Sequence, residues 1–144
     1  MRLLVIGPHG VGKTTLIRAL MGIQGKAPKT QMIEVMGEYI DTPGEYLELP
    51  RFYRALLVSA QQADLVLWVV AADKTSIHLP PGFARSFCRP VIGVINKIDV
   101  PGANIKSASE ALAQAGVEEP YHFVSAVTGA GLNELWARFK TFTS

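Results

Sequence analysis

The chain has one cysteine and no hydrophobic run long enough to cross a membrane. Cys88 has no second cysteine for an internal disulfide and no signal peptide precedes the first apolar segment, which predicts a cytoplasmic location. We expect Cys88 to be a small buried apolar residue rather than a nucleophile. The longest apolar run, residues 65 to 72, is far shorter than the roughly 20 residues of a membrane span, so no membrane partner is expected.

Charge is sparse and evenly mixed. Charged residues make up 18% of the chain, and 14 Lys and Arg residues against 12 Asp and Glu residues leave a net charge of +2. There is no stripe or run of like charge, which argues against a nucleic-acid partner. With 49% hydrophobic residues over 144 positions, the sequence predicts one globular domain, residues 1 to 144, and gives no indication of its oligomeric state.

Apolar segments alternate with helical periodicity, which predicts an α/β fold. We expect a mostly parallel sheet flanked by helices on both faces, with one antiparallel strand at an edge. Pro80, Pro81 and Gly82 interrupt the segment from 74 to 89, so its crossover should be short or irregular. The predicted strands are residues 2 to 6, 31 to 35, 37 to 41, 64 to 71, 90 to 95 and 120 to 124. The predicted helices are residues 13 to 21, ended by Gly22, a segment that begins near Pro50, and residues 105 to 115 and 132 to 139.

A glycine-rich loop joins the first predicted strand to the first predicted helix. Gly7 and Gly12 let the backbone turn its N–H groups inward on a polyphosphate, and the helix adds the positive end of its dipole. Lys13 would reach the β and γ oxygens, and the Thr14 hydroxyl would bind Mg²⁺. The predicted nucleoside di- or triphosphate site consists of Gly7, Pro8, His9, Gly10, Val11, Gly12, Lys13, Thr14 and Thr15.

Polar residues follow three further predicted strands, at the edge where parallel α/β sheets bind ligands. They are Asp41-Thr42-Pro43-Gly44, Asn96-Lys97-Ile98-Asp99 and Ser125-Ala126. In this order the motifs resemble those of the small GTPases and the translation-factor-like P-loop GTPases over nearly the whole chain. The resemblance implies the fold of a P-loop NTPase, with GTP or GDP as its ligand.

Asp99 indicates guanine on chemical grounds. A carboxylate offers two acceptors to the N1–H and 2-amino groups of guanine, whereas adenine presents an acceptor at that edge. We expect Asn96 to contact the N7 side and brace the loop, and Lys97 to lie along the ring. The Ala126 N–H, beside Ser125, is expected to meet the O6.

The resemblance also implies a magnesium site and two switches. Asp41 is expected to hold the Mg²⁺ shell through a water, and the Gly44 N–H to sense the γ-phosphate. GTPases of this type place a threonine on the first switch, and Thr30 is the only serine or threonine between Leu16 and Asp41. We therefore expect Thr30 to join the metal site when a third phosphate is present.

Two departures from the GTPase pattern bear on the rate of hydrolysis. Glu45 stands where many relatives carry a glutamine that orients water, and its charge would oppose the γ-phosphate, so unaided turnover should be slow. His9 stands where many relatives have glycine and would crowd an incoming arginine finger. Both residues could instead be solvated side chains with no catalytic part, which would leave Lys13, Thr30 and Gly44 as the groups on which hydrolysis depends.

The chain resembles one family more closely. The segments Lys29-Thr30-Gln31 and Asp41 to Glu48, together with the weak middle helix, look like the EutP/PduV family of small P-loop proteins. This resemblance implies association with bacterial microcompartments for ethanolamine or propanediol utilisation. It also leaves open acetate kinase activity, which some members have been assigned.

Three functional hypotheses follow. The first is a Mg²⁺-dependent GTPase switch with slow hydrolysis. The second is an ATP-dependent acetate kinase, in which His9, Arg51 or Arg54 would help to form a cationic acceptor pocket. The third is a nucleotide-binding adaptor that docks on a shell protein through residues 74 to 89 or the hydrophobic segment Tyr46-Leu47-Glu48-Leu49.

Overall fold

The computed structural model describes residues 2 to 23, 39 to 74 and 79 to 142. Its centre is a five-stranded sheet in the order β2-β1-β3-β4-β5, and each pairing between neighbouring strands is parallel. The parallel sheet is as predicted, but the described strands include no antiparallel edge strand, and the predicted strand at 31 to 35 lies outside the described residues. The strands are β1 (Leu3–Ile6), β2 (Tyr39–Asp41), β3 (Leu65–Ala71), β4 (Val91–Asn96) and β5 (His122–Phe123).

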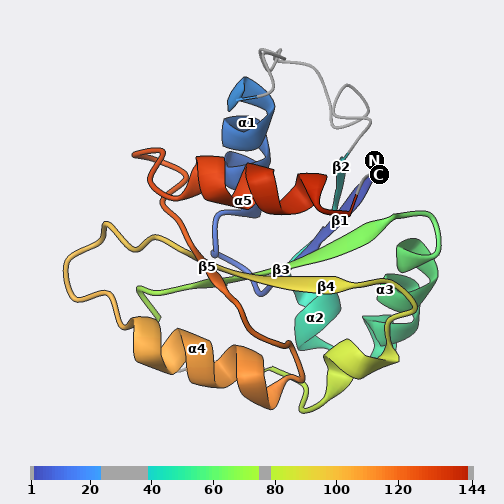
Figure 1. Ribbon diagram of the computed structural model, residues 1–144. Helices are drawn as coiled ribbons and strands as arrows, with labels where there is room; N and C mark the ends of the chain where they lie inside the picture. The colour runs from blue at the N-terminus through green and yellow to red at the C-terminus, as the bar shows by residue number, and fades with distance from the viewer. Residues whose placement is uncertain (1, 24–38, 75–78, 143–144) are drawn as a thin grey trace.

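Helices cover both faces of the sheet (Figure 1). On one face lie α1 and α5, and on the other lie α2, α3 and α4. The crossover between β3 and β4 contains only the short 3-10 helix η3 among its described residues, as the prolines predicted. The helices are α1 (Lys13–Ile23), α2 (Glu45–Glu48), η2 (Pro50–Phe52), α3 (Tyr53–Ala60), η3 (Phe83–Ser86), α4 (Ile105–Gln114) and α5 (Leu132–Lys140).

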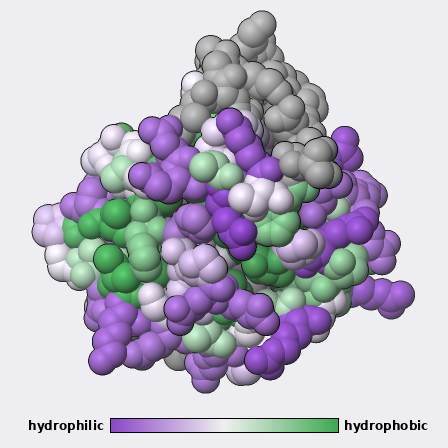
Figure 2. All heavy atoms as spheres, viewed as in Figure 1, coloured by the Kyte–Doolittle hydropathy of each residue, from purple (hydrophilic) through white to green (hydrophobic). Residues whose placement is uncertain are grey.

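Alternate residues of the central strands belong to two separate cores. Leu3 and Val5 of β1 pack with α1 and α5, whereas Leu4 and Ile6 pack with the helices of the opposite face. Because helices cover both faces, β3 is buried at all 7 positions and reads as a continuous apolar run. On the side of the molecule shown in Figure 2, hydrophilic side chains cover much of the surface, with smaller hydrophobic areas between them.

Three local expectations were wrong. Gly22 does not end α1, which continues to Ile23 because one helical glycine costs only about 1 kcal/mol and Met21 beside it is buried. Cys88 is exposed, since the neighbouring Phe87 fills the core position against Phe83. Leu47 was proposed as part of an exposed docking segment, but it is only 2% exposed because α2 folds it under the sheet.

Candidate functional site

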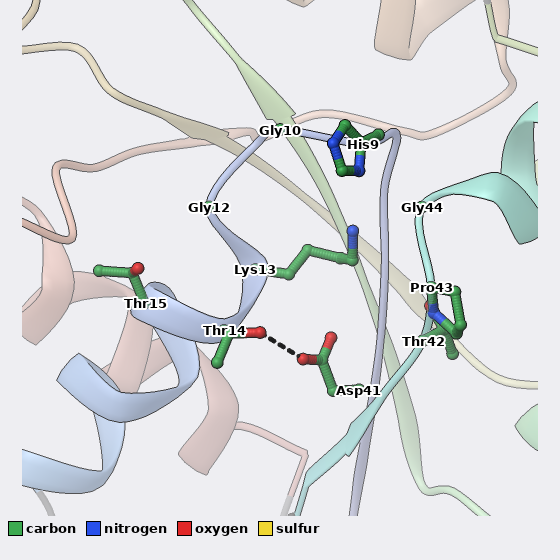
Figure 3. Close-up of a pocket in the computed structure, with 10 residues that line it drawn as sticks. All are labelled: His9, Gly10, Gly12, Lys13, Thr14, Thr15, Asp41, Thr42, Pro43 and Gly44. Carbon is green, nitrogen blue, oxygen red and sulfur yellow. Dashed lines mark hydrogen bonds between the residues drawn. The ribbon is translucent and has the colours of Figure 1, made fainter.

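A pocket of about 540 Å³ lies at the carboxyl ends of β1 and β2, where the glycine-rich loop meets the segment after Asp41 (Figure 3). The site predicted from the sequence is therefore assembled from two segments that are about thirty residues apart in the chain. The pocket is lined by His9, Gly10, Gly12, Lys13, Thr14, Thr15, Asp41, Thr42, Pro43 and Gly44.

The glycine-rich loop turns sharply between the end of β1 and the first residue of α1, Lys13. Gly12 has a φ of 85°, in the left-handed region, and a Cβ built on it would lie 2.8 Å from the Asn96 Nδ2. A side chain is therefore excluded twice at this position, by backbone strain and by contact. The resulting path brings the N-terminus of an 11-residue helix to the pocket, an arrangement suited to anions.

Lys13 is the buried cation of the pocket, with 8% of its surface exposed. Its Nζ donates to the Gly7 carbonyl at 3.0 Å and approaches the Pro8 carbonyl at 3.4 Å. Burial lowers the pKa of this ammonium, while the carboxylates of Asp41 and Glu48 act in the opposite direction. A polyphosphate would add further negative charge beside this buried cation.

Thr14 and Asp41 meet across the pocket. The Thr14 Oγ1 donates to the Asp41 Oδ2 at 2.6 Å, and Figure 3 shows the two side chains facing each other. The second carboxylate oxygen, Oδ1, is buried and has no hydrogen-bond partner among the described residues. A hydroxyl and an unsatisfied carboxylate oxygen fit Mg²⁺, which takes oxygen ligands and keeps much of its water. In the described parts of the chain no three His, Cys, Asp or Glu residues gather into a larger metal site.

The segment after Asp41 presses against the glycine-rich loop. Thr42 anchors it by donating its hydroxyl to the Val5 carbonyl at 2.8 Å. A Cβ on Gly44 would lie 2.4 Å from the His9 N, so this close approach requires glycine. The side chains of His9 and Glu45 are both exposed at the rim of this contact, and Thr30 lies outside the described residues.

Asn96 connects the second predicted motif to the loop. Its Nδ2 donates to the Val11 carbonyl at 2.9 Å, and its Oδ1 accepts the Ala126 N–H at 3.0 Å. The side chain is only 2% exposed. The predicted bracing role of Asn96 is therefore present in the geometry, but the Ala126 N–H that was expected to meet a base is donated to Asn96 here. Ser125 is fully buried, and its Oγ accepts the Thr128 N–H at 3.1 Å.

Lys97 and Asp99 extend this loop outward. Lys97 has a φ of 64°, unusual for a residue with a side chain, and its Nζ donates to the Gly10 carbonyl at 2.8 Å. The same Nζ lies 3.6 Å from the Asp73 carboxylate. Asp99 follows with an exposed side chain and no hydrogen-bond or ion-pair partner among the described residues. The strained backbone thus holds Lys97 on the glycine-rich loop, and the Asp99 side chain is exposed to solvent.

The sequence did not single out three charged residues that the structure brings to this site. Asp73 pairs with Lys97, and the Lys74 Nζ would lie 3.6 Å from a Cβ on Gly10. The third is Glu48, whose Oε1 accepts the His9 N–H at 2.8 Å. Asp73 and Lys74 come shortly after β3, which ends at Ala71, so the rule that ligands bind near the carboxyl ends of strands could have found them. Nothing in the sequence placed Glu48, because its position depends on how α2 folds back.

The chain has relatives among known proteins. Residues 1 to 141 match the model of the PduV-EutP family, described as ethanolamine utilisation and propanediol utilisation. The chain is 40% identical over 136 residues to the propanediol utilization protein PduV of Citrobacter freundii, covering 94% of this chain and 90% of that one. It is 39% identical over 121 residues to the probable acetate kinase EutP of Escherichia coli K12, covering 83% and 76%.

Solved structures with the same fold include GTP-binding proteins. A probable GTP-binding protein EngB has a TM-score of 0.67 and 20% identity, covering 99% of this chain and 98% of that chain. Aquifex aeolicus Era Y63A bound to GDP and aluminium fluoride has a TM-score of 0.64 and 24% identity, covering 98% and 56%. These likenesses show the P-loop GTPase fold.

None of the helices in the described ranges is long and apolar enough to span a membrane. The family match covers nearly the whole chain and includes every described element of the pocket. This chain belongs to the PduV-EutP family of ethanolamine and propanediol utilisation.

Proposed function

We propose that this chain binds GDP and GTP with Mg²⁺ and hydrolyses GTP slowly, as a switch or accessory protein of a bacterial microcompartment. The observation that carries the proposal is the double hydrogen bond of Asn96, to Val11 in the phosphate loop and to Ala126 after β5. A buried amide bonded to both loops fixes their relative positions, which a site built from the two loops requires.

In this proposal the pocket binds the phosphates. The amides of the glycine-rich loop and the N-terminus of α1 would bind the phosphate oxygens, and Lys13 would exchange its contacts with the Gly7 and Pro8 carbonyls for the β and γ oxygens. Thr14 and Asp41 would hold Mg²⁺, together with Thr30 in the triphosphate state. The ion would neutralise charge on the phosphates.

The base would bind at the outer end of the Asn96 loop. The exposed Asp99 carboxylate would accept the N1–H and 2-amino hydrogens of guanine, and the stem of Lys97 would lie along the ring. The Ala126 N–H is held by the Asn96 Oδ1 and could reach the O6 by sharing its hydrogen between the two acceptors. Asn96 would act mainly as the brace.

Slow hydrolysis follows from what surrounds Gly44. The Gly44 N–H is proposed to sense the γ-phosphate, since Gly44 lies directly against the phosphate loop. Glu45 is the next residue and is exposed, so its carboxylate would add negative charge near the attacking water instead of a neutral amide that can donate to phosphate. Exposed His9 would narrow the approach to the γ-phosphate from outside.

The test is to measure the affinities of mant-GDP and mant-ADP, and then phosphate release from GTP and ATP with and without acetate. We expect tight guanine binding, weak adenine binding and slow release from GTP that acetate does not change. Lys13→Ala should abolish binding, while Lys106→Ala, an exposed lysine of α4, should leave it intact. Equal affinity for both nucleotides, or binding without any release, would contradict the proposal.

Acetate kinase activity is the second candidate, because relatives at about 40% identity carry that name. It requires ATP and a cationic site for acetate. Of the candidates for that site, His9 lines the pocket, whereas Arg51 lies over the Phe52 ring at 4.9 Å, and neither Arg51 nor Arg54 lines the pocket. Acetyl phosphate formation from ATP, trapped as the hydroxamate, would favour this function over GTP hydrolysis.

The adaptor hypothesis has less support. Leu47 in one proposed docking segment and Phe83 and Phe87 in the other pack into the core opposite α1. Among the described residues of the two segments, the exposed ones include Leu49, at 38%, Glu48, and Cys88 with its polar neighbours. Loss of microcompartment targeting on changing Leu49 to Ser would revive this hypothesis.

A further inference from the structure

Glu48 makes a contact with the phosphate loop that the proposed function does not use. It is the last residue of α2, the short helix that follows Gly44, and its side chain is exposed. Its Oε1 accepts the backbone N–H of His9 at 2.8 Å. Figure 3 shows α2 leaving Gly44 on the side of the pocket where His9 lies.

The same carboxylate also acts on Lys13. Glu48 and Asp41 are the two carboxylates whose charge stabilises the buried Lys13 ammonium. Asp41 is accounted for by its contact with Thr14. The only hydrogen-bond donor to the Glu48 side chain among the described residues is the His9 N–H. Its carboxylate is therefore a negative charge of the chain itself, at the edge of a pocket suited to anions.

The contact between Glu48 and His9 lies beside Gly44. A Cβ built on Gly44 would lie 2.4 Å from the His9 N, so Gly44 packs directly against the same backbone group. In the proposed function the Gly44 N–H senses the γ-phosphate, so that phosphate would lie beside the His9 N–H, which Glu48 accepts. A diphosphate lacks the γ-phosphate and would leave the His9 N–H to Glu48.

We infer that Glu48 competes with the terminal phosphate of a bound nucleotide for the His9 N–H and for Lys13, and thereby biases the site toward the diphosphate. This inference rests on the proposed function and specifies its regulation. A triphosphate would displace the carboxylate by charge repulsion and by occupying its donor. Tyr46 of α2 stacks on Phe52 of η2, with ring centroids 4.5 Å apart, so a movement of α2 on release of Glu48 would also move η2.

The experiment compares mant-GDP with the non-hydrolysable mant-GppNHp, both with Mg²⁺, on Glu48→Gln and Glu48→Ala. Glutamine keeps an oxygen that can accept the His9 N–H but removes the charge, whereas alanine removes both. We expect Glu48→Gln to raise the ratio of GppNHp affinity to GDP affinity about tenfold, with Glu48→Ala at least as large. Glu110→Gln, the same change on the exposed face of α4, should leave the ratio unaltered.

A ratio in Glu48→Gln within twofold of the wild type, while the wild type binds both nucleotides, would overturn this inference alone. A lower melting temperature in both variants with an unchanged ratio would do the same, since it would assign Glu48 a purely structural role. Failure of the wild type to bind either guanine nucleotide would overturn the proposed function together with the inference.

Discussion

Asn96 and Val11 are 85 positions apart in the sequence, and the Asn96 Nδ2 donates to the Val11 carbonyl at 2.9 Å. With the second bond from the Ala126 N–H, one buried amide joins the phosphate loop, the end of β4 and the loop after β5. The Asn96 side chain thus fixes the base and phosphate parts of the proposed site relative to each other.

Asn96→Ala should therefore weaken both stability and nucleotide binding. It leaves the Val11 carbonyl and the Ala126 N–H without their partner, a loss of about 2 to 4 kcal/mol in the free energy of unfolding. Urea denaturation measures it. The matched control is Asn133→Ala on the exposed surface of α5, expected within about 0.5 kcal/mol of wild type. Equal free energies of unfolding for the two variants would show that the Asn96 hydrogen bonds do not stabilise the fold.

Asp41→Asn should uncouple nucleotide binding from magnesium. The neutral amide offers the proposed ion a weaker ligand, so the gain in GDP affinity on adding Mg²⁺ should fall about 10- to 100-fold. Titration of mant-GDP in Mg²⁺ and in EDTA gives the gain directly. The control, Asp64→Asn, makes the same substitution at an exposed carboxylate beside Arg2 and should keep the full gain in GDP affinity on adding Mg²⁺. If Asp41→Asn kept the full gain in GDP affinity on adding Mg²⁺, Asp41 would not take part in binding the ion.

Gly44→Ala should separate the Asp41 segment from the phosphate loop. Gly44 has a φ of −59°, which alanine adopts freely, so the obstacle is the loop backbone, where the added Cβ would lie 2.4 Å from the His9 N and 2.8 Å from the Pro8 carbonyl carbon. We expect a loss of about 1 to 3 kcal/mol of stability and weaker triphosphate binding. Gly22→Ala in α1, where nothing lies within 4 Å of the added Cβ, should instead stabilise the protein by about 0.5 to 1 kcal/mol. Destabilisation by both changes would point to the backbone rather than to the contact.

Lys13 makes a prediction about pH. Burial lowers the pKa of its ammonium below the ordinary 10.5, so between that lowered pKa and 10.5 the unfolded chain binds more protons than the folded one. The stability of the nucleotide-free wild type relative to Lys13→Met should therefore rise as pH increases through this window and level off above 10.5. Urea denaturation of both proteins across the range tests the sign, because other groups cancel in the difference. If the stability of the wild type relative to Lys13→Met fell with pH, the folded protein would raise the pKa of the ammonium instead of lowering it, which would contradict this prediction.

The sequence predicted what depends on local pattern. The glycine-rich loop, the apolar run of β3 and the polar residues at strand ends each follow from periodicity or turn chemistry, and the parallel sheet was predicted from them. The positions that failed depend on tertiary packing. Cys88 is exposed because Phe87 fills the adjacent core, and Leu47 is buried because α2 folds back. Glu48 reaches His9 for the same reason, so no sequence pattern marked it.

Selection of guanine by Asp99 is the central claim, and isothermal titration of GDP, ADP and XDP against wild type and Asp99→Asn tests it most directly. In the wild type GDP should bind roughly 10³-fold or more tightly than ADP, because adenine would leave the carboxylate without donors. Asp99→Asn should lose that preference and bind XDP most tightly, since its amide can donate to the C2 carbonyl of xanthine. ADP binding as tightly as GDP in the wild type, or undiminished GDP affinity in Asp99→Asn, would contradict the account.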